Sequence, residues 1–227
     1  SKNGKKMYNY ENNTSIMDNG GSNYHIMSRI FGTIAFDKDN NIESILDDDS
    51  KLEFYSPKFF KLIEHYKSNL EKGVLQKSLI YSNFIENAGL NNIEYLLSKL
   101  GIEYRKVTGS ESPEEKQNNI DEYNESDKIK VMLISEAGSQ GISLKNVREV
   151  HIIEPHWNCT RIQQVIGRAI RKDSHKDLDE GSRNVSIYMY VSMFPDEKDP
   201  EFLQNVEEGE QNLLANRVSS LKISDNE

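Results

Sequence analysis

Apolar residues between about Ser56 and Met193 recur with two different periods, and this pattern predicts strands and helices in turn. Continuous or alternating apolar runs predict five strands, at residues 78–82, 102–107, 131–134, 150–153 and 185–193. Continuous runs are typical of strands that are buried on both faces of a parallel sheet. The order predicts a doubly wound α/β domain, with a mainly parallel sheet and helices on both faces.

Capping residues mark where the intervening helices begin and end. Ser56 followed by Pro57 predicts the start of the first helix, and Gly101 predicts the end of the second. Residues 112–115 (Ser-Pro-Glu-Glu) form a capping box that predicts the start of a third helix. Thr160 is the expected cap of a fourth helix, which runs to about Arg171.

The two flanking segments lack this periodicity. Residues 1–52 are rich in Asn, Asp, Gly and Ser, and are expected to form a partly flexible inter-domain linker with a short apolar insert at 26–36. The α/β domain is expected at residues 53–195. Residues 196–227 are acidic, with enough apolar residues to anchor a helix, so we expect a partly helical appendage there.

Charge and cysteine content narrow the functional classes. The formal net charge of −9 disfavours binding of nucleic acid through a broad basic surface, although a local basic groove stays compatible with it. The single cysteine, Cys159, excludes an intramolecular disulfide and a cysteine-based zinc site. The sequence has no apolar stretch that would span a bilayer and no secretory signal, so we expect no membrane partner and no secretion.

The segment 161–171 concentrates the candidate chemistry. At about 100° per residue, its apolar residues fall on one side of a helix, and Gln164, Arg168 and Arg171 fall together on the other. Guanidinium groups suit phosphate oxygens and stabilise the charge that develops during phosphoryl transfer. The helix alone is equally compatible with a solvated basic face that forms ordinary ion pairs.

Several motifs together resemble superfamily-two helicases. Gln164-x-x-Gly167-Arg168-x-x-Arg171 resembles their motif VI, and residues 135–143 (SEAGSQGIS), which follow an apolar strand, resemble motif V. Residues 78–84 resemble motif IV, and Thr108-Gly109 occurs where the family has its next motif, at the end of the following strand. His156-Trp157-Asn158 resembles a Trp-Asn pair that chromatin-remodelling members have. Taken together, the sequences of these motifs are most similar to those of helicase-like early transcription factors and NTPases of large cytoplasmic DNA viruses. The resemblance therefore implies the C-terminal RecA-like motor domain of a helicase or translocase.

The resemblance also implies roles for the matching residues. Arg171 would be the arginine finger, Arg168 would reach the ATP phosphates, and Gln164 would support the same cleft. The residues expected near the nucleotide are Gly141, Ser143 and Gly167. The residues expected to hold a nucleic-acid backbone are Ser82, Thr108, Gly109 and Ser135, and for these four the alternative is ordinary strand-end turn chemistry.

The sequence lacks two parts that an ATPase of this type needs, the phosphate-cradling loop and the acidic Mg²⁺ site. ATP and Mg²⁺ are therefore expected to be held mainly by a first motor domain that precedes this one, and the isolated chain is expected to be inactive. The implied partners are that domain, DNA or RNA, and RNA polymerase or transcription-factor subunits. The implied compartments are the cytoplasm, the nucleus or a virion.

Two other functional classes stay open at this point. The first is a motor-like scaffold without activity, in a transcription or RNA-processing complex. The second, a Rossmann-type enzyme acting on small molecules, is disfavoured because no glycine-rich turn follows the first strand. No metal site is predicted: His151, His156 and His175 occur near Glu154, but the spacing of the first two puts them on opposite faces of a strand.

Overall fold

Five parallel strands form one sheet in the computed structural model, which describes residues 30–35, 42–86, 88–154, 159–171 and 173–192. The spatial order is β2-β3-β1-β4-β5, and every neighbouring pair is parallel. The strands are β1 (Ser78–Tyr81), β2 (Tyr104–Val107), β3 (Val131–Ile134), β4 (Glu149–Ile152) and β5 (Ser186–Met189). This arrangement confirms the predicted doubly wound, parallel α/β fold.

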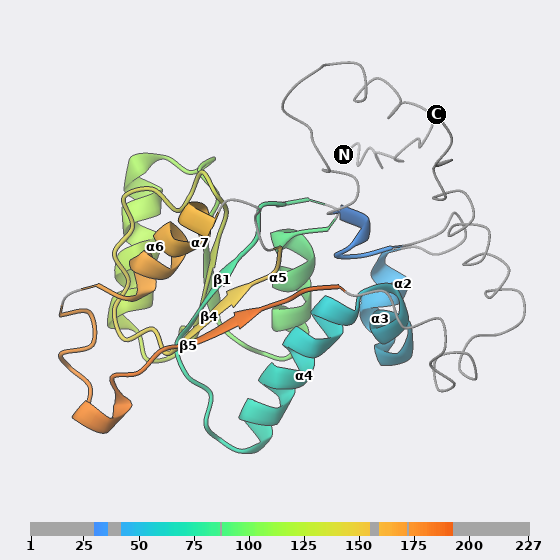
Figure 1. Ribbon diagram of the computed structural model, residues 1–227, viewed down its shortest axis with the longest axis horizontal. Helices are drawn as coiled ribbons and strands as arrows, with labels where there is room; N and C mark the ends of the chain where they lie inside the picture. Colours follow the sequence, from blue (N-terminus) through green and yellow to red (C-terminus); the bar gives the residue numbers. More distant parts are fainter. Residues whose placement is uncertain (1–29, 36–41, 87, 155–158, 172, 193–227) are drawn as a thin grey trace, which may run out of the picture. The chain divides into compact units, whose positions relative to one another are not determined.

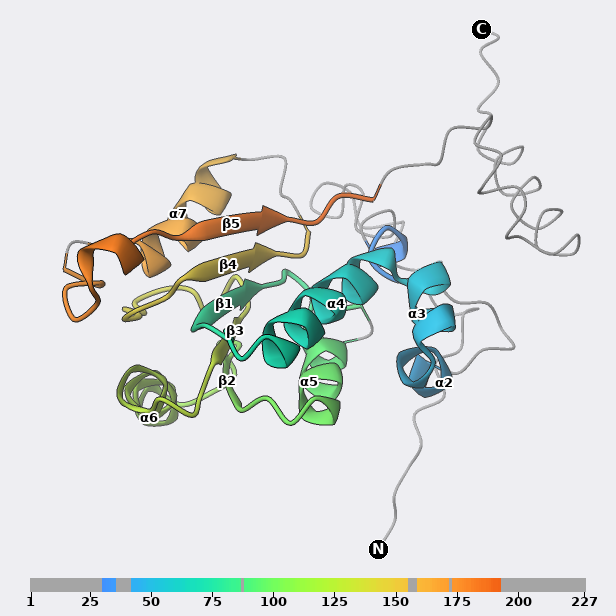
Figure 2. The ribbon, with the colours of Figure 1, turned by 90° about the horizontal axis from the view of Figure 1, so that it is seen from below.

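Helices cover both faces of the sheet (Figure 1). One face carries α4 (Pro57–Glu71) and α5 (Leu90–Lys99), and the other carries α6 (Pro113–Glu125) and α7 (Cys159–Ala169). Figure 2 shows the sheet between the two helical layers. A short 3₁₀ helix, η2 (Glu180–Ser182), precedes β5. None of the described helices is both long and apolar enough to cross a bilayer.

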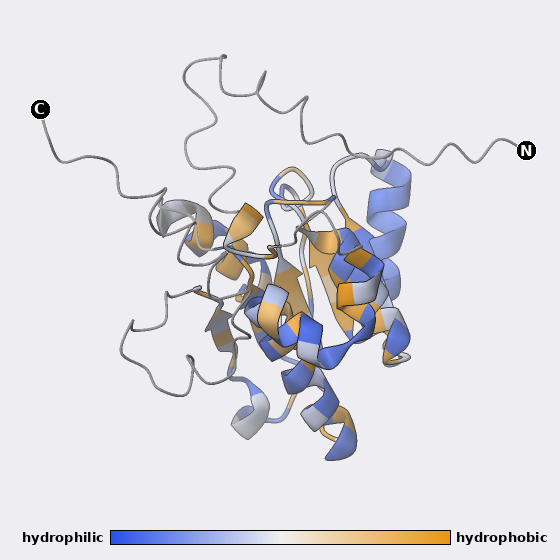
Figure 3. Cartoon of the chain, turned by 90° about the vertical axis from the view of Figure 1, so that its right-hand side faces the viewer, coloured by the Kyte–Doolittle hydropathy of each residue, from blue (hydrophilic) through white to orange (hydrophobic). Residues whose placement is uncertain are grey.

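Both faces of the central strands are buried, which explains their continuous apolar sequences. In β1, Ile80 packs in the core on the α4–α5 face, whereas Leu79 and Tyr81 pack in the core on the α6–α7 face. In β3, Leu133 and Met132 divide between the two cores in the same way. Figure 3 shows the hydrophobic strands enclosed by helices whose outer surfaces are hydrophilic.

Part of the expected linker belongs to the core. Two short helices, α2 (Ile42–Asp47) and α3 (Asp49–Tyr55), lie at the end of the segment 1–52 and in the residues that follow it. Asp48 caps α3, because its carboxylate accepts hydrogen bonds from the backbone N–H groups of Ser50 (2.9 Å) and Lys51 (3.2 Å). The acidic run is therefore a helix cap within the described residues. The side chains buried here in the α4–α5 core are Ile34, Ile45, Leu46 and Leu52.

The domain limits at 52/53 and 195/196 stay predictions, but residues 42–52 already pack with α4 and α5. Residues 1–29, with most of the apolar insert, and residues 193–227, with the expected appendage, lie outside the described part of the chain.

Most predicted helix boundaries are confirmed, and the predicted cap of the last helix is wrong. The capping box of Ser112 and Glu115 is present, and Gly101 has the positive φ (67°) expected after α5. Ser56 is the N-cap of α4, but its hydroxyl donates to the carbonyl oxygen of Thr33 (2.6 Å) and accepts no N–H of the helix. Helix α7 begins before Thr160, which is therefore not its cap, and it ends at Ala169.

The last strand shows the predicted alternation of apolar residues, but the apolar side chains are the exposed ones. Ile187 is 44% exposed, Met189 57% and Val191 64%, so the apolar row of this edge strand faces outward. Tyr188 and Tyr190, which alternate with them, point toward His151 on β4.

Replacing Leu52 by Ala is expected to lower the free energy of unfolding by about 2–5 kcal/mol, because the side chain is 1% exposed and its loss leaves a cavity. The matched control is Leu70→Ala on α4, where the side chain is 39% exposed and the loss should stay near or below about 1 kcal/mol. Urea unfolding of the 227-residue chain measures both. Equal losses would show that α3 is not part of the core.

Candidate functional site

Three of the four residues expected to hold nucleic acid are brought together at the carboxyl edge of the sheet. Ser82, Thr108 and Ser135 each follow directly after a strand, and parallel strands place these positions at one edge. The backbone N–H of Ser82 donates to the carbonyl of Ile134 (3.2 Å), and that of Ser135 donates to the carbonyl of Val107 (3.2 Å). The sheet register thus continues one residue into the site.

The hydroxyls of Ser82 and Ser135 are buried and bonded within the protein. Ser82 Oγ lies 2.9 Å from a carboxylate oxygen of Glu154, which also accepts the N–H of Asn83 (2.9 Å). Ser135 Oγ donates to the carbonyl of Thr108 (2.6 Å). In this structure, these two hydroxyls therefore stabilise the turns at the strand ends, as the alternative interpretation expects. A nucleic-acid contact through them stays a prediction.

The backbone N–H groups of Thr108 and Gly109 both donate hydrogen bonds to one carboxylate, that of Glu111. Glu111 accepts the N–H of Thr108 (2.9 Å), the N–H of Gly109 (2.8 Å) and the Thr108 hydroxyl (2.8 Å). Burial would raise the pKa of Glu111, but these hydrogen bonds outweigh it and hold the pKa below its ordinary value. Two adjacent amides that bind one anionic group form a concavity suited to anions, phosphate included.

Two glycines allow the end of β2 to contact the turn after β3. A Cβ atom added to Gly138 would lie 1.9 Å from the carbonyl oxygen of Val107, and one added to Gly109 would lie 2.7 Å from the Cβ of Ala137. Gly141, farther along the same loop, has a φ of 72° and open space around it, so it is required for its backbone conformation. These glycines connect the motifs that resemble the helicase strand-end motif and motif V.

The segment after this turn is fastened to α6 by two residues that the sequence did not single out. Asn124 Nδ2 donates to the carbonyl of Ser143 (3.0 Å), and Asn124 Oδ1 accepts the N–H of Lys145 (2.8 Å). Lys116 Nζ donates to the carbonyl of Gln140. The predicted nucleotide residue Ser143 is exposed and is held through its backbone. In the sequence, nothing distinguishes Asn124 and Lys116 from the other polar residues of a helix face.

Helix α7 shows the predicted two-faced character. Val165 and Ala169 are buried in the α6–α7 core, and Gln164 is exposed on the other side. Arg168 is half-buried, and its buried Nε has no hydrogen-bond partner among the described residues. A Cβ atom added to Gly167 would meet nothing within 4 Å, so the fold does not require glycine there.

Arg171 lies two residues beyond the end of α7, so its alignment with Gln164 and Arg168 is not fixed by the helix and stays a prediction. Its N–H donates to Ser174 Oγ (3.2 Å), and its carbonyl accepts the N–H of Ser174 (3.1 Å). This closes a turn in which Asp173 has a φ of 63°. The N–H of Ile170 still donates to the carbonyl of Ile166 (2.9 Å), but the N–H and carbonyl of Arg171 bond to Ser174, so the helix does not continue through Arg171.

The turn that carries Arg171 is fixed to the start of β4 by a buried histidine. Ser174 Oγ lies 2.8 Å from His175 Nδ1, and His175 Nε2 donates to the carbonyl of Val147 (2.6 Å). The N–H of Asn146 donates to the carbonyl of Ser174 (2.9 Å). His175 therefore braces the arginine turn, a role that only long-range contacts reveal.

Comparison with known proteins gives a consistent result. The model of the helicase conserved C-terminal domain matches residues 58–173, from the first turn of α4 to the arginine turn. A protein of Acanthamoeba polyphaga mimivirus named "Putative ATP-dependent RNA helicase L538" is 36% identical over 183 residues, which cover 79% of this chain and 40% of that protein. Nucleoside triphosphatase I of Choristoneura biennis entomopoxvirus is 31% identical over 121 residues, which cover 51% of this chain and 18% of that protein.

Among solved structures, the C-terminal part of the Fun30 ATPase domain superposes with a TM-score of 0.50 at 27% identity. That superposition covers 59% of this chain and 40% of the Fun30 chain. The chain thus spans less than half the length of these relatives. The His156-Trp157-Asn158 motif lies outside the described residues.

Gly138→Ala is expected to destabilise the chain by about 1–3 kcal/mol, because the new methyl group collides with main-chain atoms of β2. Gly167→Ala is the matched control. Its methyl group meets open space, and alanine favours the helix by up to about 1 kcal/mol. Urea unfolding compares the two. A Gly138→Ala chain as stable as the parent would show that the two strand-end motifs are not in close contact.

Proposed function

This chain belongs to the helicase conserved C-terminal domain family, and we propose that it is the second motor domain of an ATP-dependent helicase or translocase. The relatives named above are an ATP-dependent RNA helicase and a nucleoside triphosphatase, which supports a hydrolase of the helicase type. In this proposal the chain supplies arginines to ATP that a preceding motor domain holds together with Mg²⁺. It also supplies part of the track for DNA or RNA.

The observation that carries this proposal is the state of the two arginines. Neither the guanidinium of Arg168 nor that of Arg171 pairs with a carboxylate among the described residues, although the chain has nine more acidic than basic side chains. A merely solvated basic face would be expected to form ion pairs in such a chain. Two unpaired guanidinium groups, with one buried Nε lacking a partner, are what a phosphate-binding face requires.

The support around Arg171 fits the role of an arginine finger. A finger must reach a phosphate on another domain and stabilise charge that develops in the transition state, so its backbone has to be fixed. Ser174 and His175 fix the turn, while the side chain of Arg171 stays exposed. Arg168, the second-last residue of α7, would contact the phosphates, with Gln164 supporting the cleft from the exposed side.

The nucleotide-facing role of the remaining residues rests on backbone conformation. Gly141, with its positive φ, and Ser143, two residues later, are both exposed in the loop after β3. Gly167 faces open space on α7, which leaves room for close approach of a nucleotide or of the partner domain.

For nucleic acid, we propose that the amides of Thr108 and Gly109 bind a backbone phosphate in place of Glu111. The carboxylate already shows that this concavity accepts an anionic group with three hydrogen bonds. Contacts of this kind hold the backbone without reading bases. RNA polymerase or transcription-factor subunits are further proposed partners, because the motifs resemble those of viral helicase-like transcription factors.

A motor-like scaffold without activity is the second candidate. It is favoured by the hydrogen bonds at the carboxyl edge of the sheet. There Glu111 and Glu154 accept the backbone N–H groups that would otherwise be available to a nucleic-acid backbone. The unpaired arginines favour the motor, because a scaffold has no physical need for them.

In the full-length protein, Arg171→Ala is expected to lower ATP turnover by about 10³-fold or more while nucleotide affinity changes little, because a finger acts mainly on the transition state. Steady-state hydrolysis and fluorescent-nucleotide titration measure the two quantities. Turnover by Arg171→Ala at the parent rate would refute the finger assignment.

The control for this experiment is Arg105→Ala on β2. Arg105 pairs with Glu122 on α6, so its loss removes one positive charge away from the arginine turn. Its turnover should stay within about threefold of the parent if the folded fraction is unchanged. If the full-length parent hydrolyses no ATP with any polymer, the scaffold is the correct reading.

Glu111→Gln is expected to tighten binding of single-stranded nucleic acid to the full-length protein by about threefold to tenfold, because a neutral side chain competes less well for the two amides and repels phosphate less. Fluorescence anisotropy at fixed salt measures the change. Glu114→Gln, on the first turn of α6, controls for the loss of one negative charge nearby. Equal effects of the two substitutions would show that Glu111 acts only through its charge.

A further inference from the structure

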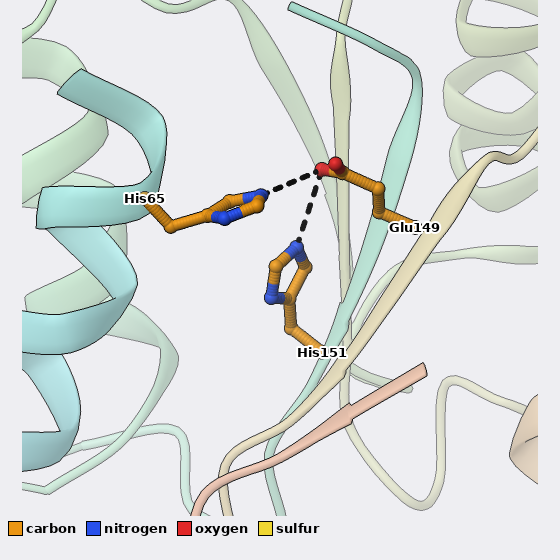
Figure 4. A group of neighbouring side chains, drawn as sticks. All are labelled: His65, Glu149 and His151. Carbon is orange, nitrogen blue, oxygen red and sulfur yellow. Dashed lines mark hydrogen bonds and ion pairs between the residues drawn. The ribbon is translucent and has the colours of Figure 1, made fainter. Parts of the chain in front are cut away.

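Three potential metal-ligating side chains converge on the α4–α5 face of the sheet. His65 comes from α4, Glu149 is the first residue of β4, and His151 follows two residues later on the same face of the strand. Figure 4 shows the two imidazole rings directed at the Glu149 carboxylate. This cluster lies near the amino end of β4, whereas the predicted nucleic-acid residues lie at the carboxyl edge.

The distances fit a single small cation. His65 Nε2 lies 3.1 Å from Glu149 Oε2, His151 Nε2 lies 3.5 Å from the same oxygen, and all the potential ligand atoms lie within 4.8 Å of one another. Ligands that bind zinc tetrahedrally at about 2.0–2.2 Å are about 3.3–3.5 Å apart. The separation of 3.5 Å already matches, the separation of 3.1 Å is slightly short, and the third is at most 4.8 Å, so side-chain movements of about 1 Å bring all three into range.

Hydrogen bonding alone leaves this cluster incompletely satisfied. His151 is fully buried, and its Nε2 has no hydrogen-bond partner of normal geometry among the described residues. His65 Nε2 faces both the Glu149 carboxylate and Asn69 Nδ2 (3.0 Å), and one ring nitrogen cannot donate to the first and accept from the second. A cation between the three groups would use the lone pairs of both imidazoles and of the carboxylate at once.

The surroundings provide the features of a supported metal site. His151 Nδ1 lies 2.9 Å from the Tyr190 hydroxyl, which suits the outer hydrogen bond that orients a ligating histidine. Tyr188 stacks on the His151 ring at 4.9 Å and limits its rotation. The side chain of His65 is 23% exposed and that of Glu149 is 9% exposed, so an ion can enter from the side of α4.

We propose that His65, Glu149 and His151 bind one divalent metal ion of the zinc class, which fastens α4 to β4. Two imidazoles and one carboxylate suit zinc and its neighbours in the first transition series better than Mg²⁺ or Ca²⁺. Water completes the coordination, or the amide oxygen of Asn69 does so if that group is turned over. The site is independent of the proposed ATP chemistry.

The test is titration of the metal-free 227-residue chain with Co²⁺, followed by displacement with Zn²⁺. The expected result is one Co²⁺ per chain, with the intense visible absorption of a four-coordinate ion and without the near-ultraviolet band of a thiolate ligand. His65→Gln and Glu149→Gln should each weaken the affinity by about tenfold or more. Zn²⁺ should raise the melting temperature of the parent by several degrees and leave that of His65→Gln unchanged.

Two controls separate this site from other metal ligands of the chain. Cys159→Ser removes the single thiol, and His175→Gln removes a buried histidine elsewhere in the fold. Both should bind Co²⁺ like the parent. Loss of binding in Cys159→Ser alone would place the metal at the cysteine and overturn the proposal.

The proposal is also overturned if Co²⁺ and Zn²⁺ bind the parent with a dissociation constant above about 0.1 mM, or if folded His65→Gln binds as tightly as the parent. If neither ligand variant folds, long-range ¹H–¹⁵N spectra of the parent decide. Zn²⁺ must shift the Nε2 resonances of two histidines and abolish their pH titration, and unchanged resonances would leave only a histidine–glutamate ion pair.

Discussion

Hydrogen bonding of five strands in one direction determines where each polar group of the candidate site can lie. Because β1 is bonded on both sides, to β3 and β4, its faces must be covered by helices on each side. The connections then run back over the faces, and all strand ends with Ser82, Thr108 and Ser135 meet at one edge. The helix with Arg168 and the turn with Arg171 lie on the return path from that edge.

The carboxyl edge of this sheet is stabilised by acids of the protein itself. Backbone N–H groups at strand ends have lost their ladder partners and need acceptors. Glu154 supplies one to Asn83, and Glu111 supplies one to Thr108 and Gly109. Charge-assisted bonds of this type are stronger than neutral ones, so the edge is ordered in the absence of nucleic acid. In the proposed binding of nucleic acid, a backbone phosphate would replace the Glu111 carboxylate at the amides of Thr108 and Gly109, which would be an exchange of anions.

The two helical layers differ in chemistry. On the α6–α7 side, Arg168 and Arg171 have no acidic partner among the described residues. Asn124, Ser174 and His175 hold the nearby loops through backbone contacts. On the α4 side, half-buried His65 packs against Tyr188 and faces the buried carboxylate of Glu149. Each face of the sheet is covered by its own helices. The α6–α7 face therefore holds the loop backbones in place, whereas the α4 face brings His65, Glu149 and His151 together.

The sequence by itself determined the fold class, the five strands, most helix ends and the family motifs, because each depends on local periodicity or on residues adjacent in the chain. Apolar runs showed which strands are buried on both faces, and Ser112 and Gly101 act within one helical turn. Tertiary structure alone decided that residues 42–52 join the core, that α7 ends before Arg171, and that Glu111 covers the Thr108 amides. It also brought His65 to Glu149, 84 residues apart. These outcomes depend on which side chains meet across the sheet and on which backbone groups they satisfy, and no periodicity in the chain encodes that.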